Sequence, residues 1–217
     1  MTEPSGGSGM PRRPVAVPVA ALLIVAAVGI TALLGGLEEV EEPPQPLSQG
    51  AVLDQGLYST KFVEARVAVE ESGFSFEEDK RFVELLFDVT NLGDETMHVG
   101  APPEKPSIVG SGFANSLIKI TPPIEDGKGP FTYALAKEGQ TSQLHPGVTT
   151  KVVVRFRLDE GERPPEKVTL DVAAFEHVPG FQDQTIQWQP VVERDGDDFQ
   201  PAVKARVTLP VKAGGPA

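Results

Sequence analysis

The sequence predicts an all-β protein, an antiparallel β-sandwich, preceded by one N-terminal transmembrane helix. An uncharged apolar run extends from Pro14 to Leu37. After Leu57, short stretches alternate apolar and polar residues, which is the period of a strand, and Gly, Pro and Asp separate these stretches. Beyond the apolar run, no stretch keeps a 3.6-residue apolar period over three turns. Roughly seven to nine strands at regular spacing are typical of a sandwich.

The run from Pro14 to Leu37 has the composition of a membrane anchor. A helix rises about 1.5 Å per residue, so roughly 20 apolar residues cross the ~30 Å hydrocarbon layer. Arg12 and Arg13 precede the run, and positive charge favours the cytoplasmic side. We therefore expect a flexible cytoplasmic tail over 1–13, an uncleaved signal-anchor helix over 14–37 in the cell membrane, and an extracellular C-terminal domain. The alternatives are a cleaved export signal, with a cut near Ala27-Val28-Gly29, and a helix buried in a soluble core.

The stretch that follows the anchor is acidic and rich in proline. It contains four glutamates, Glu38, Glu39, Glu41 and Glu42. Such a stretch buries too little apolar surface to fold, so we expect an extended tether over 38–56. The folded domain is then expected over 57–212, with a flexible C-terminus over 213–217.

Composition excludes several classes of function. The chain has 217 residues, a net charge of −12 and no cysteine. Without cysteine there are no thiol nucleophiles, thiolate zinc sites or redox motifs, and the domain depends on its hydrophobic core alone. The excess of carboxylates makes nucleic acid a poor partner, because those contacts use Lys and Arg.

The most strongly patterned strand extends from Arg81 to Asn91. Val83, Leu85, Phe87 and Val89 share one face, and Glu84, Asp88 and Thr90 lie on the other. The sequence Asn91-Leu92-Gly93-Asp94 then predicts a hairpin turn in which Gly93 takes a positive φ. Glu95 to Val99 is expected to return beside the strand.

Other stretches repeat the alternating pattern along the chain. The strands expected are Phe62–Val69, Ser116–Thr121, Phe131–Ala136, Thr149–Leu158, Lys167–Glu176, Thr185–Trp188 and Ala202–Val211. In Thr149–Leu158 the alternation puts Val152, Val154, Phe156 and Leu158 inward and Arg155 and Arg157 outward. Gly100–Gly112 and Pro122–Pro130 predict long surface loops. His145-Pro146-Gly147 predicts a turn.

Two stretches carry a resemblance to a known family. Phe87–Glu95 resembles the strand, Asn-x-Gly-Asp turn and strand of bacterial exported immunoglobulin-like domains, and Leu144–Val148 followed by Val152–Phe156 resembles a Pro-Gly turn leading into a strand. Over Gln55–Val211 the chain looks like an actinobacterial-type domain of this kind, similar to a small secreted mycobacterial antigen. The resemblance implies an immunoglobulin-like sandwich. It implies no reaction, cofactor or ligand, and the cysteine pair of antibody domains is missing.

The sequence predicts no catalytic, cofactor-binding or metal-binding residue with specificity. Met97 and His98 could serve copper, because thioether and imidazole suit that metal, but the Met-rich or His-rich spacing is missing. Asp195-Gly196-Asp197-Asp198, with Glu193, could gather calcium ligands, although an Asp-Gly turn needs no metal. Trp188 is expected to anchor the core or its rim. No nucleophile elbow, zinc-binding helix or phosphate loop occurs, so we expect no enzyme.

The expected function is therefore recognition without catalysis. The protein is predicted to display its domain at the cell surface and to bind another envelope protein or a cell-wall component. Gly100–Gly112 and Pro122–Pro130 are the loops expected to make contact. The alternatives are a copper- or calcium-binding exported domain and a cleaved, secreted antigen-like protein.

Overall fold

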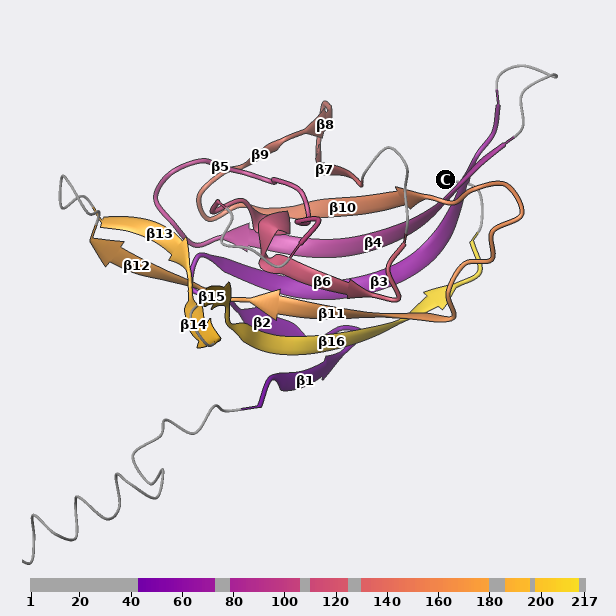
Figure 1. Ribbon diagram of the computed structural model, residues 1–217. Helices are drawn as coiled ribbons and strands as arrows, with labels where there is room; N and C mark the ends of the chain where they lie inside the picture. The colour runs from indigo at the N-terminus through magenta and orange to yellow at the C-terminus, as the bar shows by residue number, and fades with distance from the viewer. Residues whose placement is uncertain are drawn as a thin grey trace, which may run out of the picture. The chain divides into compact units, whose positions relative to one another are not determined.

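The computed structural model describes residues 43–72, 79–105, 110–124, 130–179, 186–195 and 198–214 (Figure 1). The predicted cytoplasmic tail, the predicted anchor over 14–37 and the first residues of the predicted tether lie outside these ranges. Within the described ranges, no helix has the length and apolarity to cross a membrane.

Strands dominate the described chain, and one short 3₁₀ helix, η1, covers Phe113–Ser116. The strands are β1 (Gln45–Ser48), β2 (Val52–Asp54), β3 (Tyr58–Glu70), β4 (Lys80–Asn91), β5 (Met97–His98), β6 (Leu117–Thr121), β7 (Phe131–Ala136), β8 (Gly139–Thr141), β9 (Gln143–Leu144), β10 (Thr149–Arg157), β11 (Lys167–Ala173), β12 (Phe175–Pro179), β13 (Ile186–Pro190), β14 (Val192–Asp195), β15 (Asp198–Pro201) and β16 (Val203–Lys212). The three pairs β5–β9, β12–β13 and β14–β15 form separate two-stranded ribbons.

Ten strands pair in the order β6-β11-β16-β3-β4-β10-β7-β8, with β1 on β16 and β2 on β3. The junction between β16 and β3 is short, because β16 meets β3 only through Val211 and Lys212. The network therefore forms two layers (Figure 1). We call β2, β3, β4, β10, β7 and β8 the larger sheet, and β1, β16, β11 and β6 the smaller sheet.

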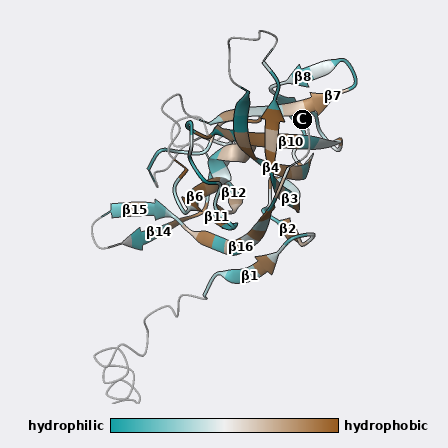
Figure 2. Ribbon diagram, turned by 90° about the vertical axis from the view of Figure 1, so that its right-hand side faces the viewer, coloured by the Kyte–Doolittle hydropathy of each residue, from teal (hydrophilic) through white to brown (hydrophobic). Residues whose placement is uncertain are grey.

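The hydrophobic core fills the space between these two sheets. The fully buried apolar side chains alternate along their strands: Val83, Leu85, Phe87 and Val89 in β4; Val152 and Val154 in β10; Val168, Leu170 and Val172 in β11; Ala205, Val207 and Leu209 in β16. Aromatic rings meet edge to face in the middle, where Phe87 contacts both Phe62 and Phe113. Figure 2 shows hydrophobic brown on β4, while the ribbon strand β15 is mainly teal. The predicted all-β sandwich is confirmed.

The ordered domain begins earlier in the chain than the sequence predicted. β1 pairs with β16 in parallel and β2 pairs with β3 in antiparallel fashion. Leu53 is buried, and the side chain of Gln55 is wholly buried. The prediction of an extended tether through residue 56 is therefore wrong for residues 45–56. The prolines and glutamates that suggested a tether end before Leu47, where the apolar pattern of the sandwich starts.

The turn after β4 also differs from its prediction. Gly93 does not adopt a positive φ. Glycine fits there because a Cβ atom would lie only 3.0 Å from Leu57 Cδ1, which leaves little room for a side chain. The buried Asn91 organises the turn: its Nδ2 donates to the carbonyl oxygens of Glu95 (2.7 Å) and Leu144 (2.9 Å). β5 therefore does not return beside β4, as predicted, but pairs with β9.

Most of the other predicted strands are confirmed, with shifted ends. The stretch predicted as one strand, Lys167–Glu176, divides at Ala174 into β11 and β12, which belong to different sheets. β8, β9 and the β14–β15 ribbon were not predicted from the sequence.

Candidate functional site

The outer side of the larger sheet carries an ordered array of charged and apolar side chains. Register places Lys61, Asp88, Lys151 and Leu135 side by side on four neighbouring strands. A second row contains Arg66, Glu84, Arg155 and Phe131. We call this surface the charged face; its members are Val52, Asp54, Lys61, Glu64, Arg66, Glu70, Lys80, Phe82, Glu84, Leu86, Asp88, Phe131, Tyr133, Leu135, Lys151, Val153, Arg155, Arg157 and Lys212.

Glu84 lies at the centre of the charged face and is only 4% exposed. Arg66 donates to one carboxylate oxygen, Oε2, from both Nε (3.1 Å) and Nη2 (2.9 Å). Arg155 Nε lies 3.5 Å from the other oxygen, Oε1. Two guanidinium groups thus compensate one buried carboxylate, as a buried charge requires.

Arg155 is more deeply buried than Arg66, Lys151 or Lys212. Its side chain is 14% exposed, and its guanidinium carbon lies 3.7 Å from the centre of the Phe82 ring. Nη2 donates to Glu70 Oε2 (3.2 Å). Because Nε is buried without a well-aligned acceptor, the ion pair with Glu84 is not fully satisfied as a hydrogen bond.

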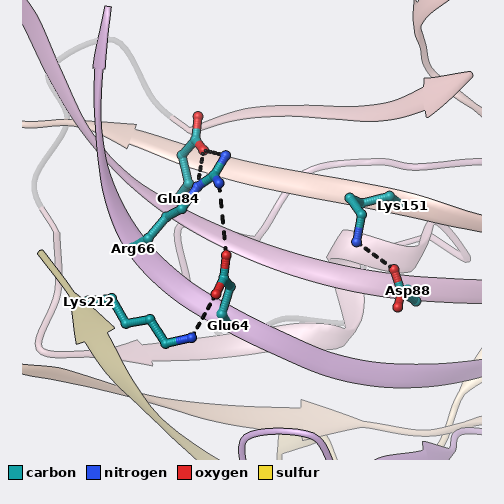
Figure 3. Close-up of polar contacts among 6 residues, drawn as sticks. All are labelled: Glu64, Arg66, Glu84, Asp88, Lys151 and Lys212. Carbon is teal, nitrogen blue, oxygen red and sulfur yellow. Dashed lines mark hydrogen bonds and ion pairs between the residues drawn. The ribbon is translucent and has the colours of Figure 1, made fainter. Parts of the chain in front are cut away.

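Two lysines extend the ion pairs toward the edges of the face. Lys151 Nζ lies 2.8 Å from Asp88 Oδ1, and Lys212 Nζ lies 2.8 Å from Glu64 Oε2 (Figure 3). The hydrogen bond from Lys212 lowers the pKa of Glu64. Figure 3 also shows Glu64 and Glu84 reaching the same arginine, Arg66, from adjacent strands.

Two neighbouring hollows open on the charged face. One, of about 420 Å³, has Leu86 and Val153 in its lining, and the other, of about 360 Å³, has Phe82 and Phe131. Arg155, Glu70 and Tyr133 line both hollows and thus form the boundary between them. Burial raises the pKa of Tyr133, so its hydroxyl remains a neutral hydrogen-bonding group at physiological pH.

Large apolar side chains are exposed beside these hollows. Phe131 is 47% exposed and Leu135 is 43% exposed. Val52, which is 61% exposed, lies apart from the hollows, on β2 of the same face. Leu86 and Val153, by contrast, are buried on the same face although no described helix or strand covers them. An apolar floor and exposed apolar neighbours on one sheet face are characteristic of binding surfaces.

The charged face is positive on an acidic chain. It carries seven cations, Lys61, Arg66, Lys80, Lys151, Arg155, Arg157 and Lys212, and five carboxylates, Asp54, Glu64, Glu70, Glu84 and Asp88, whereas the chain has a net charge of −12. The outer side of the smaller sheet is also positive, with Lys119, Lys167, Lys204 and Arg206 against Asp171. No large apolar side chain is exposed there among the described residues.

The sequence-predicted metal residues do not converge in the structure. Met97 packs against the core, whereas His98, the next residue of β5, is exposed, so their side chains do not face one site. Asp195 and Asp198 are paired at the end of the β14–β15 ribbon, and the two residues between them lie outside the described ranges. No group of three potential metal-ligating His, Asp or Glu side chains occurs within the described parts of the chain.

Trp188 does anchor the rim of the core, as predicted. It packs against the core from β13, and its ring stacks on that of His177 with 3.7 Å between ring centres. The two loops predicted to make contact, Gly100–Gly112 and Pro122–Pro130, flank a short segment of the chain: the described part of the first leads into η1 and β6, and the described part of the second follows β6. Parts of both loops lie outside the described ranges.

Sequence reasoning did not identify the charged face as a site. It placed Glu84 and Asp88 on the outer side of their strand and assigned them no role. A signal was present: from Phe82 to Phe87 only Glu84 is polar, so this strand is apolar on both sides. Such runs are typical of strands that are covered on both faces.

Comparisons with known proteins add little to this description. No protein-family model matches the chain, and no curated protein matches it. One solved structure is similar, an uncharacterized beta-sandwich protein from Clostridium difficile 630 with 12% sequence identity. The similarity covers 61% of this chain and 91% of that chain, with a TM-score of 0.39. The fold and the charged face by themselves define a β-sandwich domain with an open, partly apolar sheet surface.

Proposed function

We propose that the protein is a non-enzymatic, membrane-anchored β-sandwich, immunoglobulin-like in topology, that binds another protein or component of the cell envelope through its charged face. The anchor is the apolar run Pro14–Leu37, with Arg12 and Arg13 placing the N-terminus in the cytoplasm and the domain outside. A secreted form, produced by cleavage near Ala27-Val28-Gly29, would use the same surface without the anchor.

The observation that carries the proposal is the exposure of Phe131 and Leu135 beside two hollows on the charged face. A solvated sheet face normally places polar side chains outward and hides the apolar ones. Large apolar groups at the surface, surrounded by charges, are characteristic of protein contacts, where a partner removes them from water.

The tether in this proposal is much shorter than the sequence alone suggested. Because the sandwich begins at β1, only residues 38–44 connect the proposed anchor to the folded domain. An extended chain of that length spans about 20 Å. The proposed partner would therefore be bound close to the membrane surface rather than at a distance.

Site-specific crosslinking in intact cells tests this proposal. A photoreactive residue at Leu135 should join the protein to a discrete envelope species, and the same residue at Lys204, on the smaller sheet, should not. Protease added outside the cells should digest the domain but spare a tag on the N-terminus. No crosslink from Leu135, or a domain protected from external protease, would refute the proposal.

A further inference from the structure

We propose that the charged face docks an extended, acidic peptide segment of its partner, in which a carboxylate and an apolar side chain lie about four residues apart. This inference rests on the proposed function and names the chemistry of the partner. It is drawn from the spacing of three groups on the sheet: the exposed Lys61, the ion-paired Lys151 and the exposed Leu135.

Spacing determines the length of the segment. Lys61 and Leu135 lie in one register row, on strands β3 and β7, with β4 and β10 between them. Neighbouring strands are about 4.8 Å apart, so the two positions are roughly 14 Å apart across the sheet. An extended peptide advances about 3.4 Å per residue and covers that distance in about four residues.

Charge determines which end of the segment is acidic. Lys61 is exposed and makes no ion pair with any described residue, whereas Lys151 and Lys212 are already paired with carboxylates. A carboxylate beside Lys61 therefore gains a partner without displacing one. The positive balance of the face on an acidic chain favours an acidic partner at this surface and disfavours a basic one.

Apolar contact determines the other end. Leu135 and Phe131 border the two hollows, and Tyr133 lies between them on the same strand. An apolar side chain of the peptide that lies over Leu135 removes this exposed group from water. A uniform polyanion, such as a phosphate polymer, has no apolar group for this position, and it would also meet Glu64 and Glu70.

The smaller sheet provides an internal control for this argument. Its outer side is also positive, but none of the exposed large apolar side chains of the described chain belongs to it. If positive charge alone bound the peptide, both sheets would bind it equally. The exposed Lys204 is therefore the matched position for Lys61.

Binding is measured with the full-length protein in nanodiscs of zwitterionic lipid and four probes. The probes are a short peptide in which glutamates flank leucine and phenylalanine, its counterpart with lysine in place of glutamate, an all-glutamate peptide, and polyphosphate. We expect the acidic, apolar peptide to bind most tightly, with an affinity that falls as salt rises. Lys61→Glu and Leu135→Asp should each weaken it about tenfold, which corresponds to ~1.4 kcal/mol, while Lys204→Glu should change it less than about twofold. Leu135→Ser, with Trp188 fluorescence to verify the fold, replaces Leu135→Asp if that variant is unstable.

Three results would overturn the inference. The first is equal affinity for the acidic and the basic peptide. The second is an equal loss of peptide affinity from Lys61→Glu and from Lys204→Glu. The third is polyphosphate binding as tightly as the acidic, apolar peptide, with an affinity that Leu135→Asp does not change. An envelope partner that crosslinks at Leu135 in cells, while no acidic peptide binds, would overturn only the chemistry assigned to the partner. If the acidic peptide binds but no crosslink forms in cells, the chemistry assigned to the partner is supported. The proposal that the charged face binds a component of the cell envelope is then refuted.

Discussion

Replacing Gln55 should destabilise the domain more than replacing any exposed polar residue would. The reason is that the side-chain amide of Gln55 joins three separate parts of the fold. Nε2 donates to Ser116 Oγ (2.9 Å) and to the carbonyl oxygen of Ala173 (2.8 Å), and Oε1 accepts from Thr60 Oγ1 (2.6 Å). Gln55, Thr60 and Ser116 are all buried. Gln55→Met keeps the length of the side chain and removes only these hydrogen bonds.

The size of the effect follows from the bonds lost. A buried hydrogen bond contributes about 1 kcal/mol net, and a buried group left without a partner costs about 1–3 kcal/mol. We therefore expect Gln55→Met to lower the free energy of unfolding by about 3 kcal/mol. Gln55→Ala should cost about 1 kcal/mol more, because it also leaves a small void. Adding Thr60→Val to Gln55→Met removes the stranded hydroxyl, so the double variant should lose less than the sum of the two single changes.

Urea unfolding, followed by the fluorescence of Trp188, the single tryptophan, measures these differences. With a slope of roughly 2 kcal/mol per molar urea, a loss of about 3 kcal/mol moves the midpoint by about 1.5 M. A shift for Gln55→Met below about 0.3 M would show that the amide does not hold these elements together. Strict additivity in the double variant would show that Thr60 does not depend on it.

Three further predictions concern other parts of the domain. Glu84→Ala removes a buried carboxylate and leaves Arg155, whose side chain is 14% exposed, without it, which should cost about 2–3 kcal/mol in thermal unfolding. Glu70→Ala, whose side chain is 53% exposed, should cost under about 0.5 kcal/mol. Equal losses from the two changes would contradict the role given to the burial of Glu84. Gly56→Ala should be clearly more destabilising in urea than Gly50→Ala, because both have a positive φ but only the first would press a methyl group against a backbone carbonyl; similar midpoints would refute the close approach. The pKa of Glu64 is lowered in the fold, so its contribution to stability is present above the usual carboxyl pKa and is lost as the pH falls through the lowered value. Wild type and Glu64→Gln should therefore converge in acid, and a difference that widens toward low pH would contradict this sign.

The alternation of apolar and polar residues along the strands was the part of the fold that the sequence could predict. In the middle of β4 and β10 the inward positions, 83–89 and 152–156, carry Val, Leu or Phe, so the faces could be assigned without knowing which strands are neighbours. Pairing was harder. The ribbon β5–β9 joins Met97 to Leu144, and nothing near either residue in the sequence identifies the other.

The missed features depend on partners that are distant in the chain. Gln55 stands in the short polar run Asp54-Gln55-Gly56, within the stretch predicted as a tether, yet two of its partners are 61 and 118 residues away. Glu84 looks like an ordinary outward glutamate, yet it is buried because Arg66 and Arg155 approach it from two other strands. A single sequence contains the residue types of such clusters but not the register that brings them together.

The parallel pairing of β1 with β16 has a mechanical consequence for the proposed attachment of the domain at its N-terminus. Gln45 to Ser48 lie beside Ala205 to Thr208 with the same direction, and the described chain enters at the start of β1 and leaves at the end of β16. Tension applied between these two ends slides the strands along each other, so the four register pairs share the load rather than opening one after another. A pull directed across the strands would instead peel them apart pair by pair. The same short contact thus resists force along the strands far better than force across them.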